Sequence, residues 1–327
     1  MSDTIKSMAE FSQNKKYNEL IKMFDVKFAN YNSLKPVDFD EIIKPSKYGF
    51  DGRNPKKFKR VNASGFRQMI EEIKNNPNCS YITYINKVVK EGIVPEKLAV
   101  MDKESDVLSV SKEAIATRIL NYFGVPTSFN LPAKLKDEYH SLSVDFISEN
   151  EEFIELYTLL PPTEGEYFIE KTYRIIEIVE YYLKKLYKDE QPEKFKDNLE
   201  KFKRDLVVSF FVRQFVLGDV DCNMVNTGLL INTETWDFKL INFDLEWSLH
   251  VRRSAENFNF EYAMRKYKNE VDEVYNKCIA LANAIDKQCS ESSQISNEML
   301  SVRNNITNLF NLIKDYENAK NKDLPTN

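Results

Sequence analysis

One stretch of the sequence decides the expected fold: Phe210-Phe-Val-Arg-Gln-Phe-Val-Leu-Gly218-Asp-Val-Asp221-Cys-Asn-Met-Val-Asn226-Thr-Gly228-Leu-Leu-Ile-Asn-Thr-Glu-Thr-Trp-Asp-Phe-Lys-Leu-Ile-Asn-Phe-Asp244-Leu-Glu246. Its apolar first part predicts a buried helix that stops at Gly218, because glycine readily takes the positive φ common at helix ends. An acidic loop follows. The apolar runs 228–231 and 236–243, separated by the polar turn 232–235, predict a β-hairpin.

A hairpin brings its two outer ends together, so we expect Asn226 and Asp244 to lie opposite each other, with Asp221 on the loop nearby. Carboxylate and amide oxygens suit a hard cation such as Mg²⁺. The remaining carboxylate is available to accept a proton from a hydroxyl group. Phosphoryl transfer needs both roles, and protein kinases place the base and the amide ligand at the five-residue spacing that separates Asp221 from Asn226.

The segment Leu217-Gly-Asp-Val-Asp221-Cys-Asn-Met-Val-Asn226-Thr-Gly228-Leu-Leu, followed by Phe243-Asp244, resembles the catalytic core of HipA-type serine/threonine kinases, a group with small CtkA-like bacterial members. The resemblance covers residues 199–249. It implies a bilobal protein-kinase-like fold and Mg-ATP as the phosphoryl donor. It also implies that Asp221 is the catalytic base and that Asn226 and Asp244 are metal ligands.

The same family pairs a lysine with a glutamate to hold the α- and β-phosphates. Glu113 lies near the start of a predicted amphipathic helix, 111–123, on its apolar side, where a carboxylate requires a cation. This helix resembles the αC-like helix of the family. Lys103, on the preceding predicted strand 97–103, is the best partner for Glu113, and Lys97 is the alternative.

Several positions depart from the family pattern. The sequence has no G-x-G-x-x-G loop, and the segment Ala-Ser64-Gly65-Phe-Arg only loosely resembles the short phosphate loop of HipA-type enzymes, in which a serine can be autophosphorylated. Cys222 replaces the usual basic residue after the catalytic aspartate. Glu246 occupies the glycine position of the DFG motif, where it could face the metal or pair with Arg213.

Near residue 148 the predicted elements change from mixed strands and helices to mainly helices. This change predicts an α+β fold with a small mixed N-lobe and a larger, mainly helical C-lobe. The expected divisions are a helical N-terminal extension, an N-lobe, a C-lobe and a frayed tail, at 1–35, 36–147, 148–316 and 317–327. A loop with the basic cluster 53–60, extended segments over 128–147 and an adenine-facing hinge at 143–147 are expected. Helices are predicted at 4–30, 66–74, 84–91, 151–160, 172–187, 192–217, 261–286 and 296–316.

Composition excludes several classes of protein. The chain has 327 residues with 46 Lys and Arg against 51 Asp and Glu, and this net charge of −5 leaves no basic field for nucleic acid or an anionic membrane. Four cysteines and two histidines lack the spacing of a zinc site. No apolar run reaches membrane length and no cleavable signal is recognised. We therefore expect a cytoplasmic protein, which the resemblance implies is bacterial; export as an effector without a cleaved signal stays open, and the oligomeric state is not assigned.

These observations predict an ATP- and Mg²⁺-dependent kinase that phosphorylates Ser or Thr hydroxyls of a protein substrate, its own included. Two alternatives remain. One is a small-molecule phosphotransferase, because the Phe-Asp-Leu-Glu-Trp run at 243–247 is similar to that of aminoglycoside and choline kinases. The other is a catalytically silent kinase-like binding module. The poor phosphate loop favours the silent module, whereas the complete set of Asp221, Asn226 and Asp244 argues against it.

Overall fold

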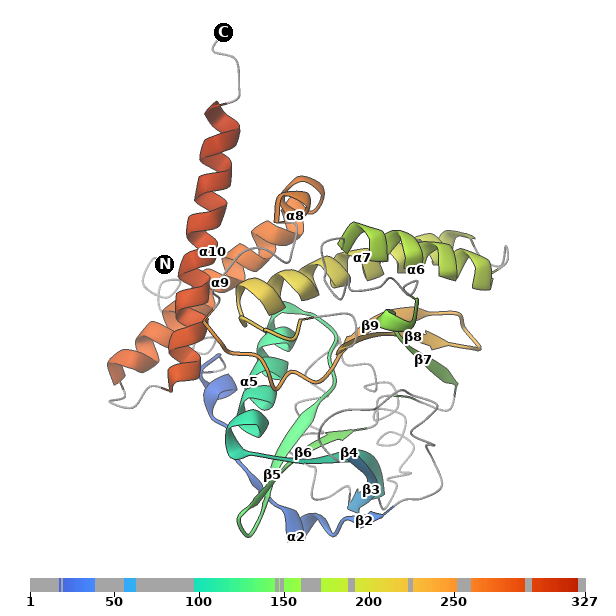
Figure 1. The fold of residues 1–327 in the computed structure, drawn as a ribbon, viewed down its shortest axis with the longest axis vertical. Coiled ribbons are helices and arrows are strands. Elements are labelled where there is room, and N and C mark those ends of the chain that lie inside the picture. The colour runs from blue at the N-terminus through green and yellow to red at the C-terminus, as the bar shows by residue number, and fades with distance from the viewer. Residues whose placement is uncertain are drawn as a thin grey trace, which may run out of the picture.

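The computed structural model describes residues 18, 20–38, 56–62, 97–144, 147, 150–159, 172–187, 192–222, 226–251, 260–291 and 296–322. Within these residues, most strands come early in the chain and most helices late (Figure 1). The architecture is therefore mixed, with a sheet-containing part followed by a mainly helical part. No helix in these ranges is long and apolar enough to cross a membrane.

The larger sheet has six strands in the order β1-β5-β6-β4-β3-β2. All neighbouring strands are antiparallel except the pair β1 and β5. The strands are β1 (Ala29–Asn30), β2 (Val37–Asp38), β3 (Lys56–Asn62), β4 (Lys97–Ser105), β5 (Asn130–Leu135) and β6 (Glu138–Val144). The predicted strand at 97–103 is confirmed and extends to Ser105. The basic cluster at 53–60, predicted to be a loop, instead lies partly in β3, because pairing with β4 satisfies its backbone groups.

Helix α5 (Val107–Phe123) lies between β4 and β5 in the chain and packs against the helical part. The Asp106 carboxylate accepts hydrogen bonds from the backbone N–H groups of Leu108 and Ser109, which caps the first turn. Gly124, with φ of 79°, ends the helix. The prediction of a helix ending at Gly124 is confirmed, although the helix begins four residues before the predicted start. Its apolar residues belong to the same core as the later helices.

A second sheet of three strands follows, in the order β7 (Glu151–Glu155), β8 (Thr227–Asn232) and β9 (Phe238–Asn242). The predicted hairpin is therefore confirmed as β8 and β9. The helix predicted over 151–160 is wrong: this segment forms β7 and a short 3₁₀ helix, η4 (Leu156–Leu159). Strand pairing with β8 and burial of Phe153 outweigh the local helical preference of the segment.

The helical part consists of α6 (Thr172–Tyr187), α7 (Pro192–Phe215), α8 (Phe260–Lys266), α9 (Lys268–Glu291) and α10 (Asn297–Lys322). The single helix predicted over 261–286 is wrong, because α8 and α9 are separated at Tyr267. Helix α10 projects from the body of the molecule and continues past Glu317, where fraying was predicted (Figure 1).

The N-terminal segment contains a strand and short helical turns, whereas only helical structure was predicted over 4–30. Its described residues form a 3₁₀ helix, η1 (Lys22–Phe24), then β1, and then the short helix α2 (Tyr31–Leu34). The helical prediction is wrong for 25–30, because Ala29 and Asn30 pair with β5 at the edge of the sheet. The helices predicted at 66–74 and 84–91 lie outside the described residues.

Candidate active site

Lys103 is the centre of a cluster of charges inside the molecule. Its Nζ atom lies 2.7 Å from Asp244 Oδ1, 2.9 Å from Glu246 Oε2 and 3.9 Å from Glu113 Oε2. These partners come from β4, α5 and the chain after β9. The structure thus brings together the predicted Lys103–Glu113 pair and the predicted metal ligand Asp244. Lys97, the alternative partner, lies six residues away at the other end of β4.

Burial and charge oppose each other in this cluster. Burial alone would lower the pKa of Lys103, but the carboxylates of Glu113, Asp244 and Glu246 together raise it above its ordinary value. Burial raises the pKa of Glu113, and the ammonium of Lys103 only partly offsets that effect. Three carboxylates therefore face one ammonium, and this excess of negative groups favours the entry of a further cation.

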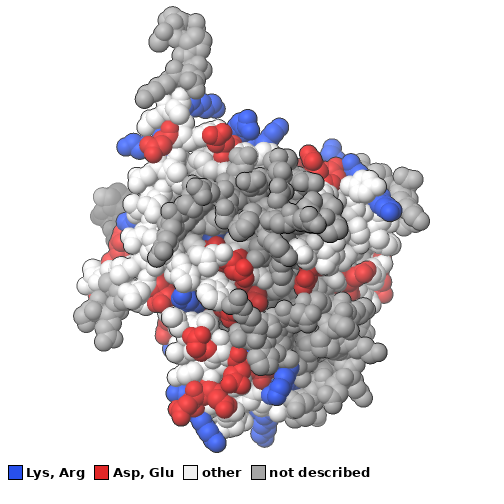
Figure 2. Space-filling model, in the orientation of Figure 1, with Lys and Arg blue, Asp and Glu red and all other residues white. Residues whose placement is uncertain are grey.

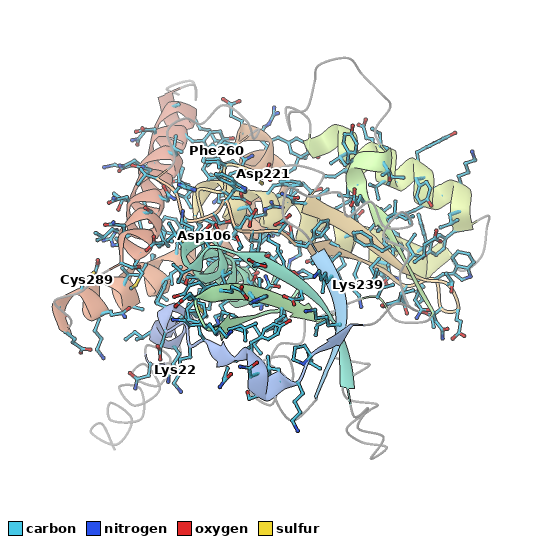
Figure 3. The ribbon with its side chains drawn as sticks, turned by 60° about the horizontal axis from the view of Figure 1, so that its bottom comes forward. Lys22, Asp106, Asp221, Lys239, Phe260 and Cys289 are labelled. Atoms are coloured by element: carbon cyan, nitrogen blue, oxygen red, sulfur yellow. The ribbon has the colours of Figure 1, made fainter. Side chains whose placement is uncertain are left out.

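Asp221 lies in the loop after α7, and Asp106 marks the start of α5 (Figure 3). The Asn226 Nδ2 atom donates to Asp221 Oδ2 at 2.8 Å and approaches the Asp221 carbonyl oxygen at 3.3 Å. Burial raises the pKa of the half-buried Asp221 carboxyl, although the hydrogen bond from Asn226 opposes this shift. A higher pKa brings Asp221 closer to the range in which a carboxylate is an effective general base.

The hairpin places Asn226 and Asp244 at neighbouring ends of its strands, as its predicted geometry requires. Thr227 is opposite Asn242, and the Phe243 N–H donates to the Asn226 carbonyl at 3.2 Å. Asp244 follows with φ of 55°, a conformation that non-glycine residues adopt infrequently. This unusual backbone occurs where the Asp244 side chain reaches Lys103.

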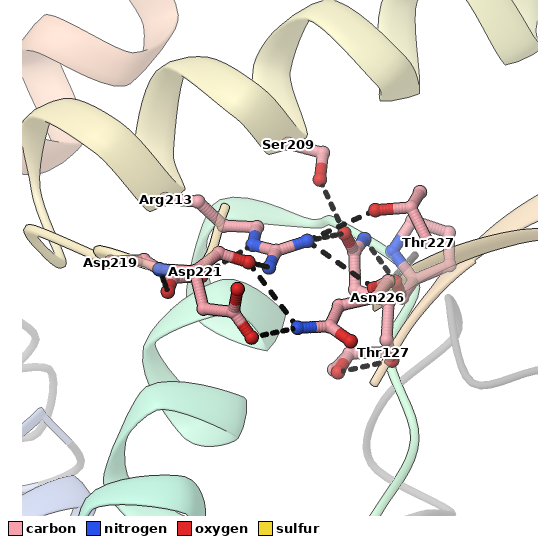
Figure 4. A network of polar contacts seen from close by, with 9 residues as sticks. Thr127, Ser209, Arg213, Asp219, Asp221, Asn226 and Thr227 are labelled. Atoms are coloured by element: carbon pink, nitrogen blue, oxygen red, sulfur yellow. Dashed lines mark hydrogen bonds and ion pairs between the residues drawn. The ribbon is translucent and has the colours of Figure 1, made fainter. Parts of the chain in front are cut away.

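Sequence reasoning missed the role of Arg213. This side chain of α7 is completely buried, and its Nε donates to Asp219 Oδ2 at 2.7 Å (Figure 4). Asp219 also accepts a hydrogen bond from the Asp221 N–H at 3.0 Å. The available signal was a single arginine within the apolar end of a helix, since a buried guanidinium requires an anionic partner.

The remaining residues singled out in the sequence either occupy defined positions in the structure or lie outside the described residues. Ser64 and Gly65 lie outside the described residues, as do residues 145 and 146 of the proposed hinge at 143–147. Cys222, at the position of the family's usual basic residue, is buried. Glu246 pairs with Lys103, whereas Arg213 pairs with Asp219.

The donor chemistry of Asp221, Asn226 and Asp244 fits a magnesium ion that is held partly by phosphates. In the part of the chain that the structure describes, no group of three or more His, Cys, Asp or Glu side chains could hold a metal by itself. Mg²⁺ is usually bound by one or two carboxylates together with waters and substrate phosphates. Asp244 and the Asn226 amide oxygen would supply the protein ligands in such an arrangement.

Basic and acidic side chains are interspersed on the face in Figure 2, with no extended basic patch among the described residues there.

No family model matches the chain. No curated protein matches it either. Among solved structures, the chain is similar to the proinflammatory kinase CtkA of Helicobacter pylori, with a TM-score of 0.42 and 12% sequence identity. The similarity covers 64% of this chain and 86% of that chain. The function is therefore inferred from the residues of the site itself.

Proposed function

We propose that this protein is an ATP- and Mg²⁺-dependent kinase that transfers the γ-phosphate to a Ser or Thr hydroxyl of a protein. One observation carries the proposal: the carboxylates of Glu113 and Asp244, from two separate segments, converge on the ammonium group of Lys103, which lies on a third segment. The Asp221–Asn226 pair adjoins the same hairpin that supports Asp244. Phosphoryl transfer requires this combination of phosphate-binding cation, metal ligands and hydroxyl-orienting carboxylate.

Each residue has a distinct chemical role in this proposal. Asp221 accepts the proton of the acceptor hydroxyl, whose oxygen forms a bond to the γ-phosphorus. The bond between the γ-phosphorus and the bridging oxygen breaks, and that oxygen leaves with ADP. Lys103 binds the α- and β-phosphates and is oriented by Glu113. Asn226 and Asp244 would hold Mg²⁺, which neutralises charge on the phosphates.

The test is transfer of labelled γ-phosphate from Mg-ATP to the purified protein and to a basic acceptor protein. Wild type should label itself or the acceptor, whereas Asp221→Asn and Asp244→Asn should lower transfer at least about 100-fold. Asp315→Asn is the matched control, because Asp315 is exposed on α10. Absence of transfer together with absence of Mg-dependent ATP binding would refute the kinase proposal.

A small-molecule phosphotransferase is the second candidate. It is favoured by Glu246, which contacts Lys103 and belongs to the 243–247 run that resembles aminoglycoside and choline kinases. Such an enzyme would consume ATP when a small alcohol is added but would label neither protein. A silent binding module would bind ATP without Mg-dependent turnover.

A further inference from the structure

Arg213 has contacts on two sides of the proposed active site (Figure 4). On the loop side, Nε donates to Asp219 and Nη2 donates to the Asp221 carbonyl oxygen at 3.3 Å. On the hairpin side, Nη1 donates to Thr227 Oγ1 at 3.0 Å and to Asn242 Oδ1 at 3.3 Å. One guanidinium therefore joins the loop that carries the proposed base to the hairpin that carries the proposed metal ligands.

The loop-side contacts hold the backbone of Asp221 at two points. Its carbonyl oxygen accepts from Arg213 directly, and its N–H donates to Asp219, which is itself paired with Arg213. The position of the Asp221 backbone is thus linked to the position of the guanidinium. The side chain of Asp221 is restrained separately by Asn226.

The hairpin-side contacts act next to both proposed metal ligands. Nη1 also approaches the Asn226 carbonyl oxygen at 3.3 Å. Asn242 precedes Asp244 by two residues and is held from several directions: its Oδ1 accepts from Ser209 at 2.7 Å, and its Nδ2 donates to the Pro126 carbonyl at 2.9 Å. The end of β9 is therefore attached to α7 and to the chain before β5.

A buried guanidinium is well suited to fix distances. Arg213 is fully buried, and burial would by itself lower its pKa, but Asp219 and the other anionic groups nearby together raise that pKa above its ordinary value. The guanidinium is planar, and its donors have fixed directions. A lysine could retain the charge opposite Asp219 but could not supply donors in the same plane to both sides.

We propose that Arg213 is a positioning residue that sets the spacing between Asp221 and the metal-side residues Asn226 and Asp244. The inference rests on the proposed kinase function and adds a determinant of its rate. A displacement of about 1 Å between reacting groups can lower the rate about 100-fold. Arg213 should thus affect kcat much more than nucleotide binding, because Lys103 and Glu113 lie outside its contacts.

The experiment compares Arg213→Lys with wild type in folded, full-length protein, measuring kcat, the KM for ATP and Mg-dependent ATP binding. We expect kcat to fall about 100-fold while KM and ATP affinity change less than about threefold. Arg204→Lys is the matched control, since Arg204 lies on the same helix but forms an exposed pair with Glu273. It should leave all three quantities unchanged.

A second variant covers the case in which Arg213→Lys does not fold. Thr227→Val removes one hairpin-side acceptor of Arg213 with little change in size, and we expect it to lower kcat with no loss of ATP binding. Unchanged kcat in folded Arg213→Lys would overturn the inference, as would unchanged kcat in Thr227→Val if the lysine variant is unfolded. Absence of turnover in wild type would instead refute the kinase proposal and, with it, this inference.

Discussion

Lys103 and Asp244, separated by 141 positions in the sequence, lie with Nζ and Oδ1 2.7 Å apart. The contact joins the central region of the larger sheet to the chain that leaves the hairpin. Glu113 and Glu246 surround the same ammonium, so Lys103 stabilises three carboxylates at once. In the proposed reaction Lys103 also binds phosphate, so its positive charge is shared with the nucleotide. A cation entering beside Asp244 would compensate the carboxylates for that shared charge.

Replacing Lys103 by Met should abolish phosphoryl transfer and lower stability. Removal of the ammonium leaves Glu113 buried without its cation, and breaking a buried ion pair costs about 3 kcal/mol or more. The double variant Lys103→Met with Glu113→Gln should recover much of the stability without recovering activity. Chemical denaturation and the labelling assay measure the two effects. Equal stability losses in the single and double variants would contradict this account.

The pH dependence of activity should reflect Asp221. Its pKa is raised mainly by burial, and the base must be ionised to accept a proton. The acidic decline of kcat/KM should therefore occur at higher pH than for an ordinary aspartate. The hydrogen bond from Asn226 lowers the pKa of Asp221, so Asn226→Ala should raise that pKa further. Carbon-13 titration of the Asp221 carboxyl in both proteins measures the shift, and a lower pKa in the variant would contradict the prediction.

Asp205 should make stability depend on pH. Burial raises the pKa of this carboxyl in α7 to about 6, although nearby Lys201 and Arg204 oppose the shift. Because the folded-state pKa exceeds the unfolded value, the ionised carboxylate is destabilising above pH 6, and the effect is absent below the unfolded pKa. Asp205→Asn should therefore stabilise the protein by about 1–3 kcal/mol at pH 8.

Urea unfolding at pH 8 and pH 4 tests this prediction for Asp205→Asn, with the exposed Asp315→Asn variant as control. The gain should disappear by pH 4, where the wild-type carboxyl is protonated in the folded protein. A variant that is less stable at pH 8 would instead indicate that the Asp205 carboxylate accepts hydrogen bonds that an amide cannot replace.

Gly228 is required by the close approach of β7 to β8. A Cβ atom at this position would overlap the ring of Phe153, whose strand pairs with β8. Gly228→Ala should therefore lower the free energy of unfolding by about 1–3 kcal/mol through overpacking. Because Phe153→Leu removes part of the opposing ring, the double variant should be more stable than the sum of the two single effects predicts. Thermal unfolding of the four proteins measures this coupling, and strict additivity would exclude the steric cause.

The sequence predicted a helix that stops at Gly218, and α7 ends at Phe215, three residues before that glycine. This residue has φ of 57°, and a Cβ atom there would overlap the carbonyl oxygen of His250. The local pattern predicted the stop, but the close approach of His250 depends on the chain after the hairpin. Local conformation and tertiary contact thus impose the same requirement on this position.

Predictions failed where local preference and long-range pairing disagree. Residues 151–160 have a helix-like composition, yet β7 forms because it pairs with β8. Since β8 begins more than 70 positions later, the local sequence gives no sign of this pairing. Arg213 was visible as a charged residue in an apolar helix, but its contacts with the loop that carries Asp221 and with the hairpin require the folded arrangement of α7 and β9. Neither pairing has a short-range signature.

The sequence by itself determined the helix stop, the hairpin and the spacing of Asp221, Asn226 and Asp244, because these depend on glycine conformation, strand alternation and turn length over a few residues. Only the tertiary structure decided that Glu246 joins Lys103 and that Arg213 connects the loop to the hairpin. The physical reason is that a buried charge must find its counterions in space, and several surrounding segments could have supplied them.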